Sequence, residues 1–404
     1  MGHRAAGMVP MNAPPFADWA LVFLQGLYRA QIALARVLHA LGLTGGADGQ
    51  AAWPWTYRIA LETLRIDAGL TRQLAFAAAA TALAVVLAGI ALASRKWRVA
   101  SALAALAVAW GAPWPPSSLW LLPAVPTSFQ RDPAPFSVSN VMRGAHLYAQ
   151  HCAACHGADG RGEGPLAATL SHWPPTFAGT LLPRRLDGEL FWRVRHGTRD
   201  EHGASTMPGF AATLGPQDTW AVLDYLKALA AGSGAQAEGA WPVPVPLPAL
   251  DVRCGGAAPQ PLDRWREGQR VRIVALAPGA TPPPEDARWQ TLLVTARGAP
   301  MVQATGAARA DCVASTPDAW LAFATIAGVA PDAFGGTQLL ADRRGWLRAR
   351  ALPGSAGWSD ADLLCRSDAT ARSAVPAANG DPLTALLLRV DTEPVRDVQA
   401  GLPH

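Results

Sequence analysis

A run of twenty residues without a charged side chain, residues 74–93, places the strongest limit on how this chain can fold. An α-helix of that length rises about 30 Å, which is about the thickness of the hydrocarbon core of a bilayer. A buried helix of a water-soluble domain is the alternative, but apolar stretches of such helices are usually shorter. The run therefore predicts a membrane-spanning helix.

Two further apolar stretches flank this run. Residues 99–112 lead through a proline-rich break toward Trp120, and three tryptophans in this region are placed as an interfacial aromatic belt would be. The first stretch, residues 17–43, also carries four polar residues on one helical face: Asp18, Gln25, Arg29 and Arg36. It either spans the membrane with this polar seam toward partner helices or lies flat on the surface. We expect it to span.

The distribution of charge predicts the orientation. Residues 1–123 hold nine Lys and Arg against four Asp and Glu, and three of these cations, Arg95, Lys96 and Arg98, lie between the two later apolar stretches. The positive-inside rule puts this loop in the cytoplasm and everything after residue 123 on the outer side. No basic patch for nucleic acid and no cleavable signal peptide are visible. Residues 1–123 are therefore predicted to anchor the chain in a bacterial inner membrane through two or three helices.

A short motif in the following region carries the chemistry. Cys152 and Cys155 are followed at once by His156, in a chain with only five cysteines. The C-x-x-C-H spacing is the attachment pattern of c-type haem, in which the thiols bond to the porphyrin and the histidine binds the iron. A zinc or redox pair is the alternative, but no second Cys or Cys/His pair at zinc spacing lies nearby. The motif predicts one covalently attached haem c on the outer side.

Residues 130–232 around this motif resemble a class I cytochrome c domain. The stretches that carry the resemblance are NVMRGAHLYAQHCAACH, which ends at the motif, and PQDTWAVLDYLKALA, which would form the last helix. The resemblance implies an all-α fold in which these two helices cross, with Gly144 allowing close contact. It also implies that the carbonyl of Pro165 accepts the ring N–H of His156.

The same resemblance implies a sixth iron ligand and a function. Met207 in the stretch STMPGF matches the distal loop of the family, and the competing imidazoles are His172, His196 and His202. With His156 and Met207 both bound to iron, no position stays open for a substrate, so electron transfer rather than enzyme catalysis is expected. Six side chains are expected to form the apolar haem wall: Trp173, Phe177, Leu181, Phe191, Trp192 and Phe210.

A Gly/Ser-rich and then proline-rich stretch, residues 233–248, predicts a linker to a last domain, residues 249–375. Short apolar strands, one helix and the hairpin GGTQLLADRRGWLRAR resemble the α/β fold of thioredoxin-like proteins of the peroxiredoxin and Sco-like groups. The loop APGATPPPED, where those proteins carry reactive cysteines, has none. We therefore expect a docking module without redox activity, followed by a tail, residues 376–404.

The three remaining cysteines, Cys254, Cys312 and Cys365, lie in this last domain. In an oxidising compartment a pair of them, with Cys254 and Cys312 preferred, would form a disulfide. Three buried free thiols are the equal alternative.

Residues 50–375 taken together resemble membrane cytochromes related to the C-terminal half of copper resistance protein D, most specifically in the bridge PTSFQRDPAPFS. The copper-transport helices of that family are missing or reduced to residues 17–43. We predict a multidomain, membrane-anchored cytochrome facing the periplasm that passes electrons between redox partner proteins. The alternative is an accessory or assembly subunit of a larger membrane complex, with a link to copper handling for which His3, Met8 and Met11 are the soft-metal candidates.

Overall fold

The computed structural model describes residues 18–179, 181–242, 244–255, 257–296, 312–355, 357–365, 381–393, 395, 398–399 and 402–403. The chain divides into two compact units, one made of Met1–Leu43 and Trp55–Ala124 and the other of Thr44–Pro54 and Val125–His404. The candidate soft-metal ligands His3, Met8 and Met11 lie outside the described residues.

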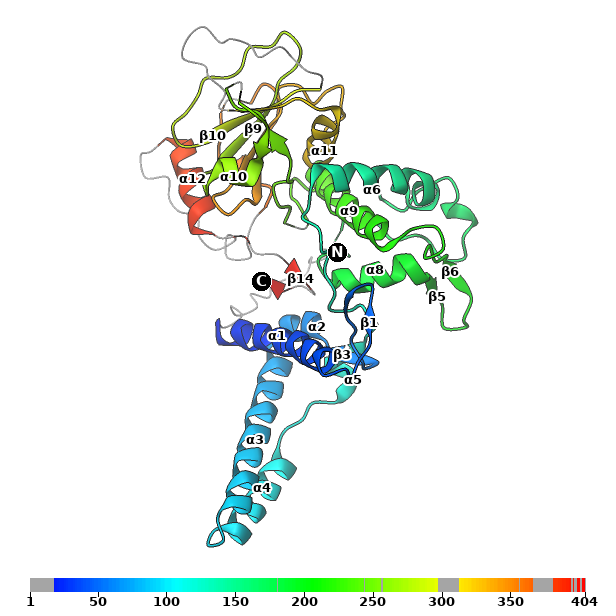
Figure 1. Ribbon diagram of the computed structural model, residues 1–404, viewed down its shortest axis with the longest axis vertical. Coiled ribbons are helices and arrows are strands. Elements are labelled where there is room, and N and C mark those ends of the chain that lie inside the picture. Colours follow the sequence, from blue (N-terminus) through cyan, green and yellow to red (C-terminus); the bar gives the residue numbers. More distant parts are fainter. Residues whose placement is uncertain are drawn as a thin grey trace, which may run out of the picture. The chain divides into compact units, whose positions relative to one another are not determined.

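The first unit is mostly helical (Figure 1). Its elements are α1 (Asp18–Ala40), β3 (Tyr57–Ile59), α2 (Leu61–Ile66), α3 (Ala68–Ala93), α4 (Arg98–Gly111), α5 (Ser117–Trp120) and β4 (Leu121–Pro123), with β3 and β4 paired antiparallel. By length and composition, α1 and α3 are candidate membrane spans. At about 1.5 Å per residue, the shorter α4, which packs along α3, reaches about 21 Å and is too short to span a bilayer alone.

The packed face of α1 is not the one that the polar seam predicts. Its buried residues are Ala20, Leu24, Tyr28, Gln31 and Ala35. Gln31 accepts a hydrogen bond from the backbone N–H of Ile59 at 2.9 Å, whereas Arg29 and Arg36 are exposed. The Arg29 and Arg36 part of the seam is therefore exposed in this unit, and the apolar stripe of α1 provides the packed face.

Helices also dominate the first half of the second unit. Its elements are β1 (Gly46–Ala47), β2 (Gln50–Ala51), α6 (Val138–His151), α7 (Ala153–His156), η1 (Ala167–Thr169), α8 (Asp187–His196), β5 (Thr198–Arg199), β6 (Ser205–Met207) and α9 (Pro216–Ala237). The side chain of Ser137 caps α6 by accepting from the N–H of Asn140. Helix α6 crosses α9 at Gly144, where a Cβ would lie 1.9 Å from the carbonyl oxygen of Ala221. The close crossing expected at Gly144 is therefore present.

A five-stranded sheet organises the second half of this unit. Its order is β11 (Cys312–Ala314), β10 (Gln290–Val294), β9 (Val271–Ala275), β12 (Gln338–Ala341) and β13 (Leu347–Ala351). The first three strands are parallel, and β12 is antiparallel to both β9 and β13. The remaining elements are β7 (Asp251–Val252), β8 (Gln260–Pro261), α10 (Leu262–Arg266), α11 (Pro317–Ala327), η2 (Asp360–Asp362), α12 (Pro382–Thr392), β14 (Val398–Gln399) and β15 (Leu402–Pro403).

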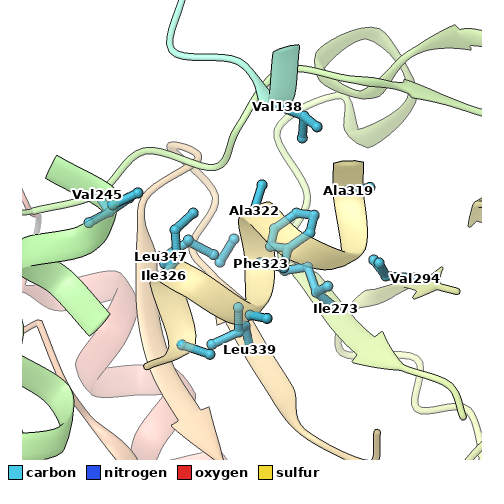
Figure 2. Packing of buried hydrophobic residues seen from close by; sticks show 14 of the residues in the cluster. Val138, Val245, Ile273, Val294, Ala319, Ala322, Phe323, Ile326, Leu339 and Leu347 are labelled. Atoms are coloured by element: carbon cyan, nitrogen blue, oxygen red, sulfur yellow. The ribbon is translucent and has the colours of Figure 1, made fainter. Parts of the chain in front are cut away.

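One hydrophobic core joins the two halves of this unit. Figure 2 shows Ala322, Phe323 and Ile326 of α11 gathered with sheet residues such as Ile273 and Leu339. The same core includes Val138 and Val141 of α6 and Ala228, Ala231 and Ala235 of α9. The helical half and the sheet half are therefore packed against each other and are not connected by a flexible linker alone.

This packing corrects the expectation that residues 233–248 form a linker. Helix α9 continues to Ala237, so residues 233–237 are helical, and Ser233 donates a hydrogen bond to the carbonyl of Asp159 at 2.8 Å. Further along, Trp241 and Val245 are buried, and the N–H of Leu347 donates to the carbonyl of Val245 at 3.0 Å. The small residues that look flexible in the sequence instead permit close packing.

Of the two alternatives for the cysteines of the second half, a disulfide or three free thiols, the structure shows the disulfide. Cys254 and Cys312 form a disulfide that closes a segment of 58 residues. Cys365 is a buried free thiol, and its burial raises its pKa to about 11. The disulfide ties the edge strand β11 to the segment after β7, where Arg253 and Val313 form a further bridge.

Candidate haem-binding site

The cysteine motif lies in the single helical turn α7 at the end of α6. The N–H of Cys152 donates to the carbonyl of Tyr148, and the N–H of His156 donates to the carbonyl of Cys152, each at 2.9 Å. Gly157 ends the turn with a φ of +78°, a conformation that favours glycine. This geometry keeps both thiols and the imidazole within one turn of backbone.

The glycine-rich loop after the motif folds back onto it. The N–H of Gly162 donates to the carbonyl of His156 at 2.8 Å, and the N–H of Gly164 donates to that of Cys155 at 3.1 Å. A Cβ on Gly164 would lie 2.4 Å from the carbonyl oxygen of Ala154, so only glycine fits there. Tyr148 donates its hydroxyl to the carbonyl of Gly157 at 2.7 Å and secures the start of the loop.

The His156 ring is held by Phe177, which stacks on it at a centroid distance of 4.8 Å. Burial lowers the pKa of His156, and the backbone of Pro175 partly offsets this effect. Proline has no N–H, so the interacting group is the Pro175 carbonyl. The buried Nδ1 atom nevertheless has no hydrogen-bond partner of full geometry. The backbone group that acts on the ring is therefore that of Pro175, whereas the carbonyl of Pro165 stays a prediction.

Met207 lies on the hairpin β5–β6, opposite Thr198 in the register. The hydroxyls of Thr198 and Thr206 are 2.8 Å apart, which joins the two strands through their side chains. Gly197 allows the turn, because a Cβ there would be 2.3 Å from the carbonyl oxygen of Met207. The Met207 side chain packs against the same apolar cluster as Cys152 and Ala153.

The three competing imidazoles are placed differently. His172 and His202 are exposed, and His202 lies within 3.5 Å of Glu201 at the surface. His196 lies against Trp192 with a ring-centroid distance of 3.8 Å. Met207 packs against the apolar cluster around the motif.

The apolar cluster agrees with most of the expected haem wall. Phe191 is fully buried and stacks on Trp220 with centroids 4.5 Å apart. Phe177 belongs to the cluster, and Leu181 and Phe210 pack against it. Trp173, which is 61% exposed, and Trp192, which packs on His196, are not part of this cluster. Leu182 and Leu214 are among the cluster residues that were not anticipated as wall.

These residues fit a covalently attached haem better than a zinc ion. Burial raises the pKa of the Cys152 thiol to about 11, whereas zinc binds thiolates. Within the described ranges, no three His, Cys, Asp or Glu side chains gather closely enough to hold a metal ion. Two free thiols, one half-buried imidazole whose buried Nδ1 has no partner and one thioether are instead the donor set that c-type haem uses.

Of the comparisons with known proteins, the one with family models agrees with this geometry. Residues 139–226 match the family model of cytochrome C oxidase, cbb3-type, subunit III. A search of curated proteins found no match. A chain of the reducing HAO-like protein complex of Kuenenia stuttgartiensis aligns at 20% identity over 34% of this chain and 61% of that chain, with a TM-score of 0.21. The match thus spans less than two thirds of that chain, and the TM-score is too low for a comparison of folds. Residues 139–226, which contain the C-x-x-C-H motif, are a cytochrome c domain like that of the cbb3-type subunit III family, with a haem-based role in electron transfer.

Proposed function

We propose that this protein is a membrane-anchored monohaem cytochrome c that transfers single electrons between redox partner proteins on the periplasmic side of a bacterial inner membrane. The observation that carries the proposal is the gathering of Cys152, Ala153 and Met207 on one apolar cluster, with the half-buried His156 stacked on a member of that cluster, Phe177. Cys152 and Cys155 would supply two attachment points for a haem, and His156 and Met207 would supply two iron ligands.

The roles of the residues follow from this arrangement. Cys152 and Cys155 would form the thioether bonds, and His156 and Met207 would bind the iron. The bound haem supplies a one-electron redox couple. Phe177 and the Pro175 carbonyl orient the His156 ring, and the hairpin β5–β6 presents Met207. The apolar cluster excludes water, which tunes the reduction potential through the local dielectric.

The membrane anchor is part of the proposal. Two helices, α1 and α3, have the length and composition of membrane spans, and Arg95, Lys96 and Arg98 follow α3. The positive-inside rule then directs the cytochrome domain to the periplasm. Anchoring would keep the domain close to membrane partners and raise its effective concentration there.

The sheet half of the second unit is proposed to be a thioredoxin-like docking module. The strand order and the antiparallel β12–β13 hairpin support this assignment. Residues 276–289, which connect the parallel strands β9 and β10, contain neither a helix nor a cysteine. The absence of thiols in this described loop supports a binding role rather than disulfide exchange.

A second candidate function is supported by the matching family, which is named for an oxidase subunit. In this case the protein would be a haem-bearing subunit of a larger membrane complex. The two functions differ after mild solubilisation of membranes. A free carrier elutes at its own mass, whereas a subunit co-purifies with stoichiometric partners.

The decisive experiment is mass spectrometry of the denatured, acid-acetone-extracted protein. A peptide spanning Cys152 and Cys155 should retain the mass of one haem, and a reduced-minus-oxidised spectrum of the intact protein should be that of a c-type cytochrome. Cys152→Ala with Cys155→Ala should abolish both signals, while Cys365→Ala should leave them unchanged. A wild-type peptide without haem mass would refute the proposal.

A further inference from the structure

A pocket of about 260 Å³ lies beside the cytochrome helices, between α8, α9 and the segment that follows α9. Three carboxylates line it, those of Asp132, Asp187 and Asp224. Lys227 is one turn after Asp224 on α9, and its ammonium is 2.8 Å from the carboxylate of Asp187. The pocket thus combines three acidic groups with one ammonium.

Asp224 is the deeply buried member of this group. Only 3% of the residue is exposed, and its Oδ2 atom has no hydrogen-bond partner. The side chain of Asn140 on α6, which donates to the carbonyl of Pro135 at 3.3 Å, has only a small effect on the Asp224 carboxyl and favours its anion. An unpartnered carboxylate oxygen in such a place is costly as an anion but tolerable as a neutral acid.

The other charged groups around the pocket act on Asp224 in both directions. Asp132 uses Oδ1 to accept from the N–H of Ala134, while its buried Oδ2 is unpartnered. Arg131 lines the pocket but is exposed, and the following segment and the β12–β13 turn contribute only uncharged side chains, Pro244, Pro246 and Trp346. The pKa of Asp224 is raised to about 7, chiefly by burial; Lys227 lowers it, and Asp132 and Asp187 raise it.

The pocket shares its wall with the haem-binding cluster. Leu182 and Leu223 line the pocket and also belong to the apolar cluster against which Met207 and Cys152 pack. Asp224 follows Leu223 directly on α9. A change of one charge in the haem site therefore acts on Asp224 through apolar side chains of low dielectric, where charges interact strongly.

We propose that the carboxylate of Asp224 is a proton-binding site whose occupancy is linked to the oxidation state of the cytochrome domain. The inference rests on the proposed function. One electron from a one-electron donor reduces the iron from Fe(III) to Fe(II), and one proton from the solvent adds to the carboxylate of Asp224. Reoxidation by the electron acceptor returns the electron and releases the proton. In this step the protein would carry one electron together with one proton.

The primary test is potentiometric titration of the full-length protein in mild detergent, at a series of values between about pH 5 and pH 9. We expect the wild-type midpoint potential to fall as the pH rises through the region around 7 and to level off on either side. Asp224→Asn should remove this fall. The matched control is Asp218→Asn. It neutralises a carboxylate that pairs with Arg143 and lies at the start of the same helix, and this variant should retain the fall in potential.

Two further measurements keep the inference testable if Asp224→Asn does not fold. Lys227→Gln removes the group that lowers the proton affinity of Asp224, so the fall in potential should move to higher pH. In addition, a reduced-minus-oxidised infrared spectrum of the wild type at about pH 7 should show a protonated carboxyl band that appears on reduction.

The outcomes separate this inference from the function on which it rests. If the peptide with Cys152 and Cys155 carries no haem, the proposed function fails and the proton linkage fails with it. If haem is present but the wild-type potential is independent of pH, or if Asp224→Asn keeps the full dependence, only the proton linkage is wrong.

Discussion

The backbone of Gly232 in α9 lies directly against the backbone of Gly328 at the end of α11, where a Cβ on Gly328 would be 2.2 Å from the Gly232 carbonyl oxygen. Hydrogen bonds surround this contact. Gln236 donates to the carbonyl of Gly328 at 2.7 Å, and the indole of Trp241 donates to that of Ile326 at 3.2 Å. The last helix of the cytochrome domain is therefore joined to the sheet half at backbone distance.

Substitution of Gly232 by alanine should destabilise this junction. The new Cβ would be 2.1 Å from the carbonyl oxygen of Thr325, so one of the helices must shift. Overpacking of this kind costs about 1–3 kcal/mol, which should lower the midpoint of urea unfolding. Gly179→Ala is the control, because its Cβ would meet only Thr176 at an ordinary 3.9 Å. Equal midpoints for both variants would contradict the close packing of α9 on α11.

Replacement of Met207 tests the sixth ligand. Met207→Ala should remove the thioether and change both the reduced spectrum and the midpoint potential. Met207→His should lower the potential, because His/Met ligation gives a higher potential than two histidines. Met142→Ala alters a methionine that packs on the core joining the two halves of the second unit, and this variant should leave the spectrum unchanged. If Met207→Ala retains the wild-type spectrum and potential, another group binds the iron.

Reduction of the Cys254–Cys312 disulfide should lower the stability of the second unit. A cross-link that closes 58 residues removes chain entropy from the unfolded state worth about 4 kcal/mol. Urea unfolding with and without a thiol reductant measures the difference. The effect should disappear in the double variant Cys254→Ala with Cys312→Ala and persist in Cys365→Ala. If the reductant lowers the stability of the double variant by the same amount, the effect does not come from the Cys254–Cys312 disulfide.

Leucine-to-arginine substitutions test the membrane anchor. An arginine in the middle of a spanning helix costs about 2.5–3.5 kcal/mol on insertion scales, so Leu83→Arg should reduce the amount of protein that resists alkaline carbonate extraction. Leu388→Arg alters an equally exposed leucine of α12 and is the matched control. Haem attachment should fall in parallel with insertion if the motif must reach the periplasm. Identical extraction of the two variants would argue against α3 as a span.

The parts of the site that depend on local sequence were predictable, and the parts that depend on loop length were not. Cys152 and His156 share one helical turn, so their proximity follows from their spacing. Pro175 lies nineteen residues after His156, beyond a glycine-rich loop, and the earlier proline in GEGP was the more obvious candidate. The sequence Pro-Thr-Phe at residues 175–177 was the available signal, because Phe177 stacks on the same ring.

Composition also led to a wrong prediction of local structure where small residues are needed for close packing. The sequence GSGAQ at residues 232–236 has the composition of a flexible linker, yet residues 232–235 are buried in α9. A single sequence does not distinguish glycine needed for flexibility from glycine needed for close contact.

The stability of the folded protein should decrease as the pH rises through the range in which Asp224 ionises. Burial first raises the folded-state pKa of Asp224 from its ordinary value of 3.8 to about 7. Between these values the folded state binds more protons than the unfolded state, so unfolding becomes easier as the pH increases. At about 1.4 kcal/mol per pKa unit, the loss amounts to about 2–4 kcal/mol between pH 4 and pH 7. Asp224→Asn should remove this part of the pH dependence and be more stable than the wild type at about pH 8, as measured by urea unfolding. Parallel pH profiles for the two proteins would show that Asp224 is ionised in the folded state at its ordinary pKa.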